Sequence, residues 1–102
     1  MSALEDIQKY APNADEAVVA AMEKTYALAL TNADARLVAF SDPEELKTMR
    51  ENFVKKKLGV TESDADIDAA IKAVGEQVPG RHQRLTVYYL LAEKYGKLGV
   101  FG

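Results

Sequence analysis

The sequence contains no cysteine and only one histidine, and both shortages exclude kinds of functional site. Without cysteine the chain forms no disulfide framework, no thiolate metal site and no thiol nucleophile. With His82 as the lone imidazole, no metal site with two histidine ligands can form. We therefore expect no cofactor. An enzyme is only a third hypothesis, since it requires a fold that brings a carboxylate against His82.

Long apolar runs are also missing from the chain. No segment approaches the ~20 consecutive apolar residues that span a bilayer. The start of the sequence, MSALED, does not resemble a basic and then apolar signal segment. We expect a cytoplasmic protein with no membrane contact.

Motifs for catalysis or ligand binding are scarce. There is no glycine-rich phosphate loop, serine elbow or zinc signature. The alternating carboxylates of Asp64-x-Asp66-x-Asp68 begin like a calcium loop. Ala69 then stands where that loop needs glycine, and Gly75 where it needs glutamate. We interpret these carboxylates as acids at a helix N-terminus and expect a non-enzymatic protein.

Only three prolines and six glycines interrupt the chain, which favours helices over short strands. A chain of 102 residues suffices for one domain, over residues 1–102, with roughly 5,700 Å² of folded surface. Hydrophobic periodicity and capping residues predict the helices. They are residues 4–10, a helix capped by Asn13 that ends near Leu30, one or two turns within 35–40, a helix capped by Asp42 that ends near Lys57, residues 67–78 and residues 85–98.

The last of these segments is apolar over most of its circumference. From Leu85 to Leu98, apolar side chains cover roughly 260° of the helix, so it is either surrounded by other helices or keeps a face for a partner. In so short a chain we favour the interpretation that other helices surround it. We predict an all-α fold, a compact irregular or orthogonal bundle of five to six helices around this C-terminal helix.

Aromatic residues of the C-terminal segment provide the leading functional hypothesis. Tyr88 and Tyr89 are adjacent and cannot point the same way on a helix, so one of them is a candidate for contact with a partner. Tyr95 and Phe101 complete the set of candidate protein contacts. We expect a module that acts through protein–protein contacts, in the form of a homodimer. At helical spacing, however, the favoured interpretation of the tyrosines is that they belong to the core, with the hydroxyl at its rim.

Basic residues provide the alternative hypothesis. The net charge is −3, which argues against a general nucleic-acid or membrane binder, yet residues 46–60 hold five basic residues and one acid. A nucleic acid or phosphate ligand would need several of the cations on one face. The candidate anion contacts are Lys47, Lys55, Lys56, Arg81 and Arg84. For the lysines at the end of a helix, interaction with the helix dipole is the simpler interpretation.

Three stretches of the sequence together resemble a known family. They are DIQKYAPN at 6–13, FVKKKLG at 53–59 and YYLLAEKYGKL at 88–98. The chain is similar, over essentially its whole length, to short bacterial proteins grouped as domain of unknown function 2853. The resemblance implies a bacterial, cytoplasmic, stand-alone helical protein. It implies no activity and no catalytic residues, and it assigns no role to the lysine triplet or the tyrosine pair.

Overall fold

The computed structural model describes residues 3–26, 38, 40, 42–78 and 83–101. Two features expected from the sequence lie outside the described residues. They are most of the turns within 35–40, and the residues Arg81 and His82. The second helix ends at Thr25, about five residues before the predicted end near Leu30.

Helices make up the described part of the chain, which contains no strand. The elements are α1 (Ala3–Gln8), α2 (Glu16–Thr25), α5 (Pro43–Thr48), the π-helix η1 (Met49–Lys57), α6 (Asp64–Gln77), α7 (Arg84–Lys94) and the 3₁₀-helix η2 (Leu98–Val100). The predicted all-α bundle is therefore confirmed. The total accessible surface is 5826 Å², close to the value expected from the mass.

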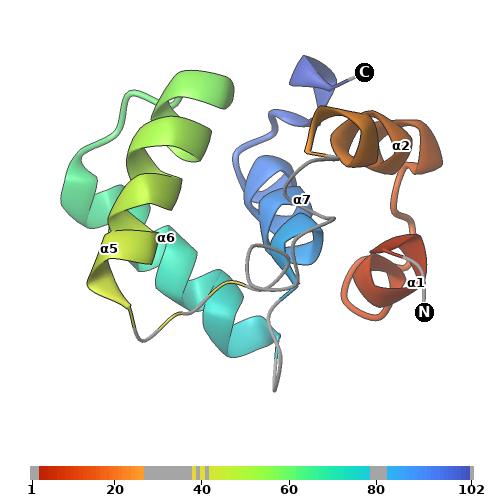
Figure 1. Ribbon diagram of the computed structural model, residues 1–102, viewed down its shortest axis with the longest axis horizontal. Coiled ribbons are helices and arrows are strands. Elements are labelled where there is room, and N and C mark those ends of the chain that lie inside the picture. Colours follow the sequence, from red (N-terminus) through yellow and green to blue (C-terminus); the bar gives the residue numbers. More distant parts are fainter. Residues whose placement is uncertain (1–2, 27–37, 39, 41, 79–82, 102) are drawn as a thin grey trace.

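Helix α7 lies at the centre of the bundle. It packs against α1, α2, α6, η1 and η2, and α1 and α2 lie on the opposite side from α5, η1 and α6 (Figure 1). Every residue from Leu85 to Ala92 is buried. The apolar circumference of this segment is thus covered by the other helices of the same chain. This agrees with the prediction that the other helices surround it.

The start of α5 has the capping residue that the sequence predicts, whereas the start of α2 has a different one. Asp42 caps α5 by accepting a hydrogen bond from the Glu44 N–H, as predicted. Helix α2 is capped by Asp15, so the prediction of Asn13 was wrong. The Asp15 side chain accepts from the N–H groups of Ala17 and Val18. Its own backbone N–H donates to the Tyr89 hydroxyl at 2.9 Å, so a contact with α7 fixes where α2 begins.

The helix predicted to end near Lys57 changes type halfway. Its second half, η1, is a π-helix, in which hydrogen bonds span five residues: the Leu58 N–H donates to the Phe53 carbonyl at 2.9 Å. The wider turn lets the consecutive residues Phe53 and Val54 both point into the core, where they are 2% and 0% exposed. Gly59 ends the helix with a φ of +72°, the left-handed conformation that favours glycine.

Helix α7 ends at Lys94, four residues before the predicted end at Leu98. Gly96 adopts a φ of +65°. The N–H of Lys97 then donates to the carbonyl of Ala92 at 2.7 Å and that of Gly96 to Glu93 at 3.1 Å, the two bonds of a Schellman motif. This glycine stop turns the chain into η2, which packs back against α7.

One polar pair is buried between the first helix and the central one. Among the described residues, Asp6 and Thr86 are the buried side chains that are not apolar, at 7% and 0% exposure. The Thr86 hydroxyl donates a hydrogen bond to the Asp6 carboxyl group. This contact satisfies both groups and fixes α1 against α7.

Candidate functional site

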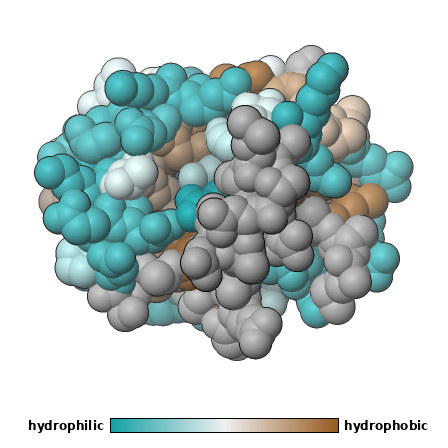
Figure 2. Space-filling model, in the orientation of Figure 1, coloured by the Kyte–Doolittle hydropathy of each residue, from teal (hydrophilic) through white to brown (hydrophobic). Residues whose placement is uncertain are grey.

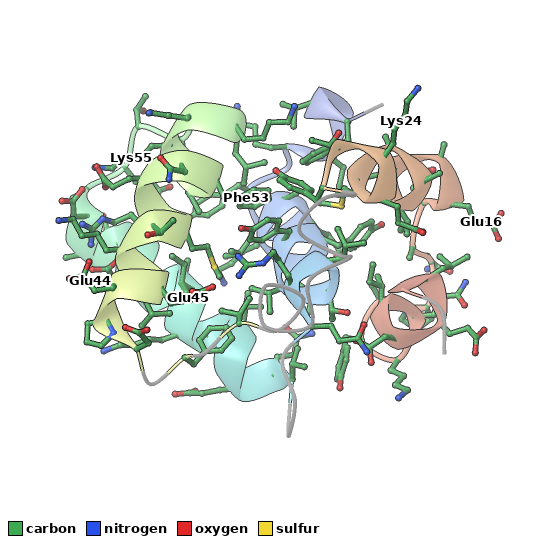
Figure 3. The ribbon with its side chains drawn as sticks, in the orientation of Figure 1. Glu16, Lys24, Glu44, Glu45, Phe53 and Lys55 are labelled. Atoms are coloured by element: carbon green, nitrogen blue, oxygen red, sulfur yellow. The ribbon has the colours of Figure 1, made fainter. Side chains whose placement is uncertain are left out.

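An aromatic cluster joins η1, α2, α7 and the C-terminal turn, the segment from Leu98 to Phe101 that contains η2. The rings of Phe53 and Tyr88 are stacked, with centroids 3.9 Å apart and an interplanar angle of 12°. Tyr26 meets Tyr88 edge-on at 5.1 Å. Phe101 lies 6.3 Å from Phe53 and 6.4 Å from Tyr26, and Phe53 points from η1 toward α7 (Figure 3). The cluster extends from the core to the surface at Phe101, which is only partly buried.

The two adjacent tyrosines of α7 point to different helices, and both are buried. Tyr88 is 7% exposed against Phe53. Tyr89 is 1% exposed and accepts the hydrogen bond from Asp15. Neither ring is therefore open to a partner in this fold. The reason is that Phe53 of η1 covers Tyr88, whereas the start of α2 covers Tyr89.

The other two aromatic candidates, Tyr95 and Phe101, are partly buried. The Tyr95 hydroxyl is enclosed and has no hydrogen-bond partner among the described residues. Burial, and then the charges of Glu62 and Asp66, raise the pKa of Tyr95. Phe101 keeps a surface-facing side, and the Lys57 ammonium lies 5.0 Å above its ring. Of the four candidates, Tyr95 and Phe101 thus keep partial exposure, whereas Tyr88 and Tyr89 do not.

Arg84, a candidate anion contact, links α5 to α7 inside the bundle. Its guanidinium donates to the Glu45 carboxylate at 2.6 Å and to the Tyr88 hydroxyl at 2.9 Å. Burial lowers the pKa of Arg84, but Tyr88 and Glu45 more than offset it and the net direction is upward. The positive charge of Arg84 is therefore compensated within the protein.

Lys55, a second candidate, belongs to an ion-pair network that ties η1 to α6. Its ammonium pairs with Asp64 and lies 3.0 Å from Glu51. Arg50 bonds both Glu51 at 2.8 Å and Asp68 at 3.0 Å. Hydrogen bonds from Arg50 and Lys55 lower the pKa of Glu51, and those to Asp64 and Glu51 raise the pKa of Lys55. The network compensates Lys55 as it does Arg84.

Lys47 and Lys56 are exposed, and no carboxylate of the described residues lies within 4.0 Å of either ammonium group. Because Lys55 and Arg84 are paired and Arg81 lies outside the described residues, the structure shows no single patch made of the five predicted cations. It instead brings Lys47 to one open cavity with Lys72, a residue absent from the predicted set. No signal in the sequence indicates this pair, since the two residues lie on different helices.

The described residues contain no group of three or more His, Cys, Asp or Glu side chains that could hold a metal ion. Within the same part of the chain, no helix is both long and apolar enough to cross a bilayer.

The structure thus defines a small all-helical bundle whose central C-terminal helix is enclosed by the remaining helices. The model of a family described as "Protein of unknown function (DUF2853)" matches residues 2–99. The chain belongs to this family, as the three sequence stretches suggested. No match is found among curated proteins.

Proposed function

We propose that this protein is a non-enzymatic helical domain that acts through protein contacts, with a second copy of the chain as its partner. The observation that carries the proposal is an apolar surface at the C-terminal turn. Among the described residues, Val100 is the large hydrophobic side chain that is exposed, with 42% of its surface accessible. Figure 2 shows apolar surface at the top of the view, where η2 lies, beside a largely hydrophilic exterior.

The C-terminal turn is continuous with the aromatic cluster of the core. Leu98, Phe101 and Tyr26 are partly buried side chains packed against the core, and Val100 stands beside them. Aromatic side chains that rest on a rigid core cost little conformational entropy when they bind. In a two-fold dimer the same patch meets its copy, so an apolar surface is complementary to itself. A stable interface buries about 800 Å² per partner, to which this patch would supply the centre.

Sedimentation velocity across a concentration series tests the proposal. We expect the wild-type sedimentation coefficient to rise with concentration, and Val100→Lys to keep the chain monomeric, because a charge would enter an apolar interface. Ala69→Lys is the matched control, since Ala69 is exposed on α6 and should not affect association. A wild-type chain that stays monomeric at millimolar concentration would refute the proposal. A dimer that survives Val100→Lys would refute the proposed surface.

The alternative of a nucleic-acid surface receives less support. Two of its five cations, Lys55 and Arg84, are paired with carboxylates of the same chain. Counterion release requires cations that are free to contact phosphates.

We also propose, from the family resemblance, that the protein is bacterial and cytoplasmic.

A further inference from the structure

An open cavity of about 340 Å³ lies between α5, the start of η1 and the middle of α6. Its volume falls at the lower end of the range for small-molecule sites, roughly 300–1,000 Å³. Leu46 and Ile71 supply apolar lining, and Ile71 is 1% exposed, so this part of the wall belongs to the rigid core. The cavity thus combines an apolar base with the charged side chains described next.

Lys47 on α5 and Lys72 on α6 reach the cavity from two different helices. Both side chains are exposed. Neither ammonium group has a carboxylate of the described residues within 4.0 Å, in contrast to Lys55 and Arg50. Their charges are therefore available to a ligand, and their flexible stems let them approach it from two sides.

Two carboxylates also line the cavity, and one of them is already compensated. The Arg50 guanidinium donates to both oxygens of Asp68, at 3.1 and 3.0 Å. With Arg50 and Asp68 paired, the two lysines outnumber the remaining acid, Glu44. A local excess of positive charge in a chain of net charge −3 marks a place where an anion is favoured.

We propose that this cavity, between Lys47 and Lys72, binds the phosphate group of a small phosphate monoester. A dianion can interact with both ammonium groups at once, which a single carboxylate does less well. The organic part of the ester would lie against Leu46 and Ile71, where it leaves water. This site is on a different face from the C-terminal turn and does not depend on the proposed dimer.

Phenyl phosphate is a suitable probe, because it joins a dianionic head to a compact apolar body. We would titrate it into the ¹⁵N-labelled protein at low salt and follow the backbone amide signals. We expect saturable shifts at Lys47, Ile71 and Lys72, and weaker binding as salt rises. Inorganic phosphate should bind more weakly than phenyl phosphate, because it lacks the apolar body.

The variant Lys47→Gln/Lys72→Gln should raise the dissociation constant about ten-fold or more, since it removes both charged hydrogen-bond donors. Its control is Lys24→Gln/Lys97→Gln, which loses the same charge at exposed positions outside the cavity; Lys24 points away from the bundle (Figure 3). All four side chains are exposed, so both variants should fold.

Three results would overturn the assignment: no saturable shift, an equal loss of affinity in the control variant, or unchanged affinity in the cavity variant. If inorganic phosphate binds as tightly as phenyl phosphate, the apolar lining takes no part and the monoester assignment is wrong. Val100→Lys should leave this affinity unchanged, so failure of the dimer proposal is distinguished from failure of this one.

Discussion

Asp6 and Thr86 form a buried hydrogen bond between residues 80 positions apart in the sequence. A carboxyl group inside an apolar core requires hydrogen-bond donors. Asp6 accepts from the Thr86 hydroxyl, and the Lys9 ammonium lies 3.8 Å from its carboxylate. The bond therefore matters for how α1 joins the bundle, although neither residue stands out in the sequence.

Thr86→Val should lower the free energy of unfolding by about 1–3 kcal/mol, because the shape is retained while the Asp6 carboxyl group loses its donor. Urea unfolding would measure the loss. The matched control is Thr25→Val, at an exposed threonine whose hydroxyl donates only to its own helix at Ala21. Its effect should stay within about 0.5 kcal/mol. Equal effects of the two variants would mean that the buried bond contributes nothing.

Ile71→Ala should cost about 2–5 kcal/mol, the usual range for truncating a fully buried isoleucine. Ile71 is 1% exposed on the inner face of α6. Gln77→Ala, at an exposed position of the same helix, serves as the control and should change stability by less than about 0.5 kcal/mol. If Ile71→Ala were as mild as the control in chemical denaturation, the placement of α6 against the core would be wrong.

Asp42→Ala should cost about 0.5–2 kcal/mol through loss of the cap of α5. The exposed Asp42 carboxylate accepts a hydrogen bond from the Glu44 N–H at 3.0 Å. Asp42→Asn keeps a side-chain acceptor and should restore most of the stability in thermal unfolding. An asparagine variant as unstable as the alanine variant would show that the effect does not come from capping.

Tyr26 should ionise later than an ordinary tyrosine. Burial and then the neighbouring Tyr88 raise the pKa of Tyr26 to about 12, against the opposing effect of Arg84. The raised pKa means that its contribution to stability is complete below about pH 10, the pKa in the unfolded chain, and is lost as the pH rises toward 12. Absorbance of tyrosinate against pH would show this late step, and Tyr26→Phe should remove it. An unchanged titration curve in that variant would contradict the assignment.

Much of the fold follows from patterns within the sequence. The narrow apolar stripe of residues 67–78 predicted α6, and the sequence Asp42-Pro43 predicted the start of α5. The nearly continuous apolar surface after Leu85 predicted a central helix, and α7 is buried from Leu85 to Ala92. These features depend on burial and capping, which act over a few residues and are therefore readable along the chain.

The candidate sites could be predicted far less well. The sequence predicts Lys55 and Arg84 as cations available to an anion, but α6 supplies Asp64 to the first and α5 supplies Glu45 to the second. The sequence predicts Tyr88 and Tyr89 as candidate partner contacts, but η1 and α2 cover them. Lys72 lay outside the prediction because its closeness to Lys47 depends on how α5 packs against α6. Charge and aromaticity are local properties, whereas availability depends on neighbours from other helices.

The sequence by itself determined the helical class, the central position of the last helix and the α5 cap, since hydrophobic periodicity and capping act within one helix. Only the tertiary structure decided that Asp15 rather than Asn13 begins α2, that η1 widens into a π-helix, and which cations stay unpaired. Each of these outcomes depends on a partner distant in sequence, and the energy of such a contact exists only once the helices are packed together.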